Sequence, residues 1–531
     1  MKLSFAPVRY NMRMLLISVA VRRSIFLALA ASWMIGGLVT NPASAQKSKD
    51  TLRFPVSDME TGIDMYTLPG NFANVWGPSV FDYLIGFDSR AGAFVPQLAK
   101  SWAQPDSLTY EFELRDDVKW HDGQALDADD VVYTLNYLTD PKVNLRHTIR
   151  WSWIKSVEKL GTHKVRFTAS QPVPYGLMWM ASYTPIYPEH AHSSAANKLT
   201  FAGRPIGTGP LRVVQMDRNV GIIGEKYAEY TASSVKPASG VGRVIAEPIQ
   251  DMGSLTAMLL TGKADLAVGL PSDQADALRA SGQFDFSMAP PSVGYTFLGF
   301  PSKGAMNVKA LADQRVRTAI MKAIDRKALS TAKWGALAEK VAPANALCAK
   351  EQLGCGYTKE PLAYDPVGAK RLLAEAGYAD GFDVVISCFP TSIVDATAIS
   401  GMLRAIGIRA TVRQNSVAQR VQLLSQGKVD IGYYAWDGGA VFDVSGPIGR
   451  HVEAQEYDDA TLAKLAEPIH AILDDGERRK AAARIFDYIT ENSYASVVLS
   501  SLVIYTHTKE VKLNTSAPRA VPVNPHEFTW K

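Results

Sequence analysis

Short runs of alternating apolar and polar residues follow one another along the chain, interleaved with longer runs that have helical spacing. Alternation with β-branched and aromatic residues predicts strands at 52–56, 110–115, 164–169 and 383–389. Apolar residues spaced three or four apart predict helices at 128–138, 314–332, 366–378 and 460–475. This interleaving indicates a mixed α/β fold class and argues against a helical bundle or a β-sandwich. The stretch 233–242, which contains proline and glycine, is expected to form an exposed loop.

An apolar run lies near the N-terminus. Arg22-Arg23 precede this run, Ser24–Val39, and Ala43-Ser44-Ala45 follow it. A basic flank, a short apolar core and an A-x-A ending predict a secretory signal peptide at 1–45, and hence a periplasmic protein. The alternative is a single membrane anchor, for which about 20 apolar residues are needed.

Removal of residues 1–45 changes the charge balance. That segment holds five basic residues and no acid, so 56 Lys+Arg fall to 51 against 52 Asp+Glu, a net charge of −1. A near-neutral chain without a dense Lys/Arg run has no electrostatic footprint for nucleic acid. A length of 531 residues exceeds one ordinary hydrophobic core, so two or more domains are expected.

The chain has three cysteines, Cys348, Cys355 and Cys388. Cys348 and Cys355 bracket a short loop, and an oxidising compartment favours a disulfide between them. Cys388 lies in an alternating, strand-like run and is expected to be a buried free thiol. Because no C-x-x-C motif occurs, neither a redox dithiol nor a cysteine zinc site is supported.

The most acidic stretch, Arg115–Leu138, contains six aspartates and one histidine. Metal ligation and acid–base catalysis are possible interpretations, but both need side chains that converge on one point. The local pattern instead predicts a strand end, an Asp122-Gly123 turn and a helix start. Asp127 is expected to be the N-cap and Asp130 its capping-box partner, so the stretch is interpreted as structural.

Other enzyme signatures are weak. His190 and His192 could ligate a metal from a strand, but the preceding Pro188 favours a surface helix start. No H-E-x-x-H, G-x-S-x-G or P-loop motif occurs. The glycines of GTGPLR, 207–212, are expected to permit close backbone packing near a cleft. We therefore expect no enzyme, no resident metal and no cofactor.

Five motifs occur in a fixed order from the first strands onward. The first, at 81–135, carries P-x-L-A-x-S-W and W-x-D-G patterns. The others are RPIGTGPLRV (204–213), LTGKADLAVGL (260–270), DQRVRTAIMKAIDRKAL (313–329) and YDPVGAKRLLAEAGYADGF (364–382). Together they resemble the extracytoplasmic solute-binding proteins of the peptide/nickel (oligopeptide/dipeptide-binding) type that serve ABC importers, family 5.

The resemblance implies a two-lobed periplasmic-binding-protein fold, type II in its large three-domain form, with the ligand cleft between the lobes. It places lobe one at 46–90, 203–300 and 496–531, an additional domain at 91–202, and lobe two at 301–495. The C-terminal residues NPHEFTWK are expected to end on lobe one.

The implied function is capture of a peptide-like or other small organic solute for delivery to a membrane permease, by a monomer. The alternatives are a carrier of a metal chelate, a cofactor or an opine-like conjugate, and a secreted hydrolase. Closure of the lobes over ligand would be a population shift.

The ligand-site candidates follow from the resemblance and from the chemistry of clefts, which need aromatic walls and a few polar anchors. In relatives a tryptophan is followed by an aspartate that pairs with the α-amino group of the ligand, and Trp436 and Asp437 are similar to that pair. Asp443 competes for the amine role. Core packing is the alternative for the remaining candidates, which are Tyr434, Asn74, Trp76 and Tyr295.

Overall fold

The computed structural model describes residues 50–56, 59–68, 72–145, 148–193, 198–249, 251–288, 293–302, 308–436, 442–453, 457–514 and 523–531. The predicted signal peptide, 1–45, and the candidate ligand residue Asp437 lie outside these ranges. Within them, no helix combines the length and the apolar character that a bilayer crossing requires.

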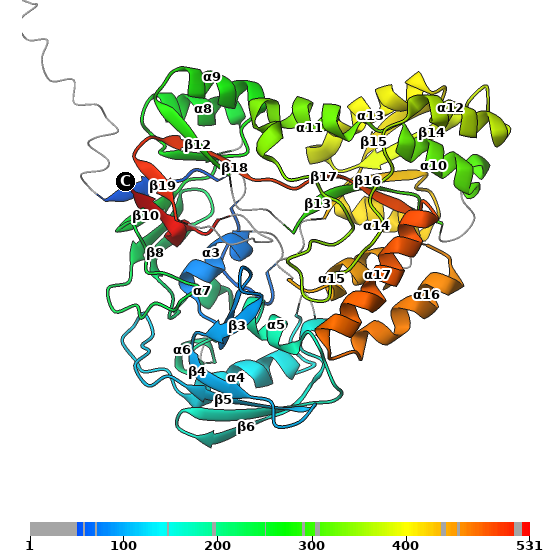
Figure 1. Cartoon of the computed structure of the whole chain (residues 1–531). Helices are drawn as coiled ribbons and strands as arrows, with labels where there is room; N and C mark the ends of the chain where they lie inside the picture. Colours follow the sequence, from blue (N-terminus) through cyan, green and yellow to red (C-terminus); the bar gives the residue numbers. More distant parts are fainter. Residues whose placement is uncertain are drawn as a thin grey trace, which may run out of the picture.

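The first half of the molecule is built on small sheets, drawn mainly in blue, cyan and green with a red C-terminal part (Figure 1). Its strand orders are β1-β10-β9-β8, β11-β18-β12, β4-β5-β7-β6, β2-β3 and β19-β20. The strands are β1 (Thr51–Arg53), β2 (Ile85–Asp88), β3 (Ala93–Pro96), β4 (Ala99–Ala103), β5 (Thr109–Leu114), β6 (Ile154–Gly161), β7 (Lys164–Ala169), β8 (Leu211–Asp217), β9 (Gly221–Lys226), β10 (Arg243–Ala246), β11 (Leu266–Val268), β12 (Phe284–Met288), β18 (Ile504–Thr508), β19 (Val511–Leu513) and β20 (Phe528–Trp530).

Short helices cover these sheets. They are α3 (Phe72–Val80), α4 (Ala128–Thr139), α5 (Gly176–Ser182), α6 (Glu189–His192), α7 (Lys198–Gly203), α8 (Met252–Leu260) and α9 (Ser272–Ala280). The C-terminus returns to this half, because Thr529 of β20 bridges Gly240 and His526 lies 2.9 Å from the Ser79 hydroxyl.

The second half is one five-stranded sheet between helices, drawn mainly in green, yellow and orange (Figure 1). Its strand order is β15 (Arg409–Gln414), β14 (Asp383–Cys388), β16 (Ile431–Trp436), β13 (Tyr295–Gly299), β17 (Ala495–Ser500). Its helices are α10 (Gln314–Lys322), α11 (Arg326–Trp334), α12 (Pro366–Glu375), α13 (Ile393–Ala405), α14 (Val417–Ser425), α15 (Ser445–Ile448), α16 (Ala460–Ala466) and α17 (Asp475–Glu491).

Two chain crossovers join the halves. One runs from β12 to β13 and the other from β17 to β18, because each pair of strands belongs to different sheets. The Ser501 amide donates to the Gly294 carbonyl oxygen (2.9 Å), which ties the crossovers together. The halves also touch away from the crossovers, where the rings of Phe87 and Phe442 lie 5.8 Å apart and those of Tyr175 and His470 lie 5.9 Å apart. The fold is the two-lobed, mixed α/β arrangement expected for family 5, whereas the domain limits stay a prediction.

Two predicted helices are wrong in extent. The helix expected at 314–332 is split, because Asp325 caps a second helix by accepting from the Ala328 amide (2.8 Å). The helix expected at 460–475 ends at Ala466, since Pro468 lacks an amide donor and cannot continue it. The loop expected to be exposed at 233–242 is also wrong in part, because Lys236 in it is only 6% exposed.

Candidate functional site

Four aromatic side chains share one face of the second-half sheet. The antiparallel register of β13 and β16 pairs Tyr295 with Trp436 and Phe297 with Tyr434. Alternation along each strand puts all four on the same face, where Tyr295, Phe297 and Tyr434 are buried and Trp436 is partly buried. The predicted candidates Tyr295, Tyr434 and Trp436 are therefore neighbours, and the first two also serve the core.

His451 packs against this aromatic face, next to Tyr295 and Phe297. The Tyr295 hydroxyl donates to the Leu347 carbonyl oxygen (2.7 Å) and lies 2.9 Å from Nε2 of His451. Because the single hydroxyl proton goes to Leu347, the His451 Nε2–H donates to the tyrosine oxygen. Burial, and then the charges of Arg450 and Arg420, lower the pKa of His451 well below its usual value. The ring is neutral, and it braces Tyr295.

A cavity of about 460 Å³ lies at the crossovers. Tyr295 is on its wall together with both crossovers and a long loop, in the ranges 293–295, 340–346, 348–351 and 500–502. Two lysines, Lys340 and Lys350, and one acid, Glu351, line it with the ring of Tyr357. The cavity is thus mostly apolar in its walls and carries a small excess of positive charge.

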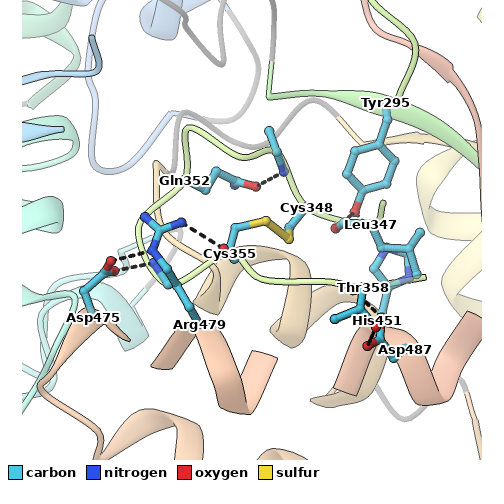
Figure 2. Close-up of a disulfide and its surroundings, with 12 residues drawn as sticks. Tyr295, Leu347, Cys348, Gln352, Cys355, Thr358, His451, Asp475, Arg479 and Asp487 are labelled. Carbon is cyan, nitrogen blue, oxygen red and sulfur yellow. Dashed lines mark hydrogen bonds and ion pairs between the residues drawn. A yellow bond between two sulfur atoms is a disulfide. The ribbon is translucent and has the colours of Figure 1, made fainter. Parts of the chain in front are cut away.

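The loop closed by Cys348 and Cys355 forms one wall of that cavity. The structure joins the two cysteines in a disulfide with their Cα atoms 5.9 Å apart (Figure 2). Figure 2 also shows how the loop is held, since the Cys355 carbonyl oxygen accepts from Arg479 of α17 (3.0 Å). Inside the loop the Gln352 side chain accepts from the Ala349 amide (2.8 Å). Cys388 is a buried free thiol, as expected.

Asp443 is engaged by another residue of the chain. Its two carboxylate oxygens accept from the two terminal nitrogens of Arg478, at 2.7 and 2.8 Å, and the side chains are 0% and 3% exposed. One oxygen also accepts from the Ser445 amide (2.8 Å). A bidentate, buried pair of this kind fixes local geometry, and it makes Asp443 the weaker candidate for a ligand amine.

Asn74 and Trp76 lie in the first half, on α3. Trp76 is fully buried, stacks on Phe72 with ring centroids 6.0 Å apart and packs against Gly224 of β9. Asn74 is half-buried on the same helix. The structure thus places Trp76 in the core of the first half, and it does not bring this pair to the aromatic face.

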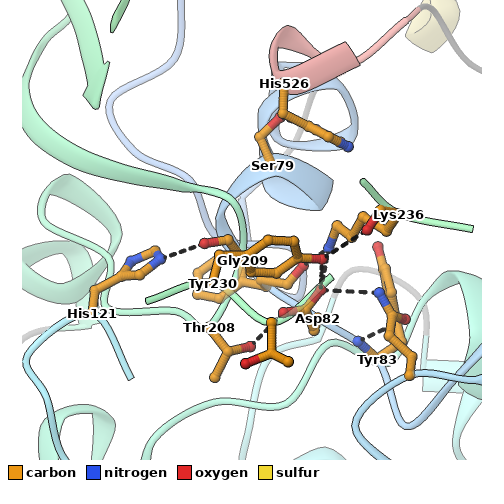
Figure 3. Close-up of polar contacts among 12 residues, drawn as sticks. Ser79, Asp82, Tyr83, His121, Thr208, Gly209, Tyr230, Lys236 and His526 are labelled. Carbon is orange, nitrogen blue, oxygen red and sulfur yellow. Dashed lines mark hydrogen bonds and ion pairs between the residues drawn. The ribbon is translucent and has the colours of Figure 1, made fainter. Parts of the chain in front are cut away.

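A polar network inside the first half is centred on Asp82 (Figure 3). Asp82 accepts from Lys236 (2.6 Å), Gln97 (2.9 Å) and Thr208 (2.8 Å). Lys236 also donates to the Phe81 carbonyl oxygen (2.5 Å), and burial lowers its pKa. All the partners satisfy one another, which is the arrangement of a structural network.

The acidic stretch is structural, as predicted. Asp127 caps α4 and forms a capping box with Asp130, and Gly123 has the positive φ of the expected turn. His121 takes the Gly207 amide on Nδ1 (3.2 Å), so its Nε2–H donates to the Gly209 carbonyl oxygen (2.9 Å). Burial lowers the pKa of His121 to about 4. Through His121, the stretch therefore contacts the backbone of the GTGPLR motif. Only glycine fits at position 207 of that motif, because a Cβ there would lie 1.9 Å from the Val80 carbonyl oxygen.

The histidine pair 190/192 starts a helix, as expected, but not wholly on the surface. His192 is fully buried, with Nδ1 2.6 Å from the Tyr133 hydroxyl, and His190 lies 2.7 Å from Asp122. Among the residues that the structure describes, no three His, Cys, Asp or Glu side chains gather as metal ligands.

Sequence reasoning missed the loop at 340–351 and the Phe442–Phe87 contact. A proline-containing, non-periodic stretch before Cys348 was the one available signal for the loop. The contact joins residues 355 positions apart, and no local pattern encodes it.

The chain matches the profile of the bacterial extracellular solute-binding proteins, family 5 (middle region), over residues 93–455. The glutathione-binding protein GsiB of Pectobacterium atrosepticum is 26% identical over 361 residues, which are 67% of this chain and 66% of that protein. The fold is similar to DppA from Helicobacter pylori in complex with peptide STSA, with TM-score 0.73, 20% identity and coverage of 91% and 99% of the two chains. NikZ from Campylobacter jejuni in complex with Ni(L-His) gives TM-score 0.73 and 23% identity at the same coverage.

Proposed function

Because the chain belongs to the bacterial extracellular solute-binding proteins of family 5, we propose that it captures a small peptide-like solute and delivers it to the permease of an ABC importer. The general role, solute binding for an ABC importer, follows from the family. The identity of the ligand, the residues that contact it and the localisation of the protein are proposed below.

The observation that carries the ligand proposal is the cavity at the crossovers. Its volume of about 460 Å³ lies in the range of about 300–1,000 Å³ that suits small organic ligands. Tyr295 and Tyr357 offer ring surface, and Lys340 and Lys350 offer cations for a carboxylate. A short peptide with an acidic side chain or a free C-terminus has this combination of groups.

The relatives support the same class. A relative that matches about two thirds of the chain is named for glutathione, an acidic tripeptide. We therefore propose an acidic di- or tripeptide as the ligand class. Among the described residues, no three His, Cys, Asp or Glu side chains gather as metal ligands.

Trp436 and Asp437 are proposed as the amine end of the site. The indole N–H of Trp436 is buried and meets no acceptor among the described residues, so a ligand carbonyl can accept from it. Asp437 follows directly in the chain, and a carboxylate there would pair with an ammonium group. Tyr434 supports the same strand, whereas Asn74, Trp76 and Asp443 are secondary candidates.

The family is extracellular, and the predicted signal peptide supports our proposal that the mature protein lies in the periplasm. We also propose a monomer that performs no chemistry and contacts no nucleic acid. Its two halves would close over the solute, with the closed state favoured by the ligand.

Titration calorimetry with the mature chain tests the ligand class. S-methylglutathione, two acidic dipeptides and their N-acetylated forms are the ligands, and Ni(L-histidine) is the comparison. Asp437→Asn should weaken the amine-bearing ligands about tenfold or more and leave the N-acetylated forms unchanged. Asp380→Asn, at an exposed aspartate of the second half, is the control. Binding of the nickel chelate alone would refute the peptide proposal.

A further inference from the structure

The disulfide-closed loop Cys348–Cys355 is joined to the segment that follows the candidate ligand residues. The Leu353 amide donates to the Phe442 carbonyl oxygen (2.8 Å), and the Val444 amide donates to the Leu353 carbonyl oxygen (2.9 Å). The two bonds flank Asp443, so Leu353 forms an isolated parallel bridge with this segment. The loop therefore fixes the backbone position of Phe442.

The loop is itself anchored firmly. The Gly354 amide donates to Asp475 of α17 (2.6 Å), and the Cys355 carbonyl oxygen accepts from Arg479 on the same helix. Gln352, which is 0% exposed, closes the loop from inside. A crosslink that closes a ring of eight residues restricts the conformations open to Leu353.

Phe442 reaches the other half of the molecule. Its ring lies 5.8 Å from the ring of Phe87 at an interplanar angle of 40°, and Phe87 belongs to β2 of the first half. Aromatic pairs in this distance range attract each other beyond their buried area. The contact joins the two halves, so it favours the arrangement in which they touch.

We propose that the Cys348–Cys355 loop is a positioning element for lobe closure, which acts by holding Phe442 against Phe87. Its consequence for solute affinity rests on the proposed function, but the closure can be measured without any solute. The disulfide then does more than stabilise the second half, because it sets how often the ligand-free chain is closed.

Single-molecule energy transfer in the ligand-free mature chain tests the proposal. Dyes attached through non-cysteine handles at Val220 and Val394, exposed by 60% and 76% on the two halves, report the ratio of closed to open molecules. The Cys348→Ser/Cys355→Ser variant should lower this ratio about three- to tenfold, the range that one aromatic pair spans. Cys388→Ser, which removes the buried thiol of the same half, should leave the ratio unchanged.

A double-mutant cycle separates positioning from general loosening. Phe87→Ala alone should lower the ratio by a similar factor, and the triple variant should show no further loss, because both changes break the same contact. The proposal would be overturned if the losses in the Phe87→Ala and serine variants multiplied in the triple variant. It would also be overturned if the serine variant kept the wild-type ratio of closed to open molecules, or if the wild-type chain had no closed population.

A second pair of variants applies if the serine variant does not fold. Leu353→Pro removes the amide that donates to Phe442 and keeps the disulfide, whereas Leu353→Ala keeps that amide. Only the proline variant should open the chain. A chain that closes normally and binds no peptide would refute the proposed ligand and leave this inference intact, so the two failures are distinguishable.

Discussion

Among the residues that the structure describes, each half of the molecule holds a buried ion pair, and the two pairs differ in their surroundings. In the first half Lys236 and Asp82 are 7% and 4% exposed, and further donors from the same half surround the carboxylate. In the second half Arg478 and Asp443 are 3% and 0% exposed. The second pair is one residue away from Phe442, which touches the first half.

The cations of the two pairs also differ in pKa and in geometry. Burial lowers the pKa of the Lys236 ammonium, a point charge that donates to Asp82 and to the Phe81 carbonyl oxygen. Burial also acts to lower the pKa of Arg478, but the hydrogen bonds and charge of Asp443 raise it overall. A bidentate fork fixes orientation as well as charge. The first pair therefore stabilises one half, whereas the second also orients a segment at the boundary between the halves.

Breaking the first pair should have the largest effect on stability alone. Lys236→Met leaves the Asp82 charge buried without its cation, which costs about 3–5 kcal/mol. Urea unfolding should record that loss, while calorimetry on the folded fraction should give unchanged ligand affinity. Lys100→Met, at an exposed ion pair with Glu113, is the control and should change little. A large affinity loss in Lys236→Met would contradict the distinction between the pairs.

Breaking the second pair should affect both properties. Arg478→Met leaves Asp443 unpaired at about the same cost in unfolding free energy, and it also frees the segment around Phe442. We expect ligand affinity to fall several-fold in the folded protein, measured by the same calorimetry. Equal affinity in Arg478→Met and wild type would show that both pairs are merely stabilising.

Acid should weaken the first half through His121. The pKa of the buried ring is about 4 against a usual value of 6.5, so the unfolded chain binds the proton more readily. The stabilisation is complete above pH 6.5 and is lost as the pH falls toward 4, by about 3 kcal/mol. The unfolding free energies of wild type and His121→Gln should converge over that interval. If the unfolding free energies of wild type and His121→Gln kept a constant difference over this pH range, His121 would not be the cause of the acid sensitivity.

The smallest expected effect concerns the acidic stretch. Asp127→Ala removes the side chain that caps α4 and should cost about 1 kcal/mol of unfolding free energy. Asp116→Ala, at an exposed turn position of the same stretch, is the matched control. Thermal unfolding of both variants and titration of ligand affinity would show whether either aspartate has a role beyond structure; we expect affinity to stay constant.

Sequence patterns predicted the structural features that depend only on residues close together in the chain. The Asp127 cap, the Gly123 turn and the general alternation of strands and helices depend on residues within a few positions of one another. The break before Asp325 was missed because helical periodicity continues across it, and only the cap interrupts the backbone.

Contacts between residues far apart in the sequence could not be predicted from such patterns. The sequence marked Asp443 as a candidate for a ligand amine, but its partner Arg478 lies 35 positions away on a helix whose placement depends on the whole sheet. Burial of Lys236 in a proline- and glycine-containing stretch has the same origin. The aromatic face was partly predictable, since Tyr295, Tyr434 and Trp436 alternate on their strands, but their shared register depends on pairing between distant segments.

The proposed function requires that the mature chain carries one small peptide-like solute. Native mass spectrometry of the protein purified from its own host, without added ligand, tests this most directly. We predict a second species heavier than the bare chain by the mass of one small peptide, which dissociates on denaturation and rebinds on titration to the refolded chain. A bare mass alone, together with no binding of any acidic di- or tripeptide added afterwards, would contradict the proposed function.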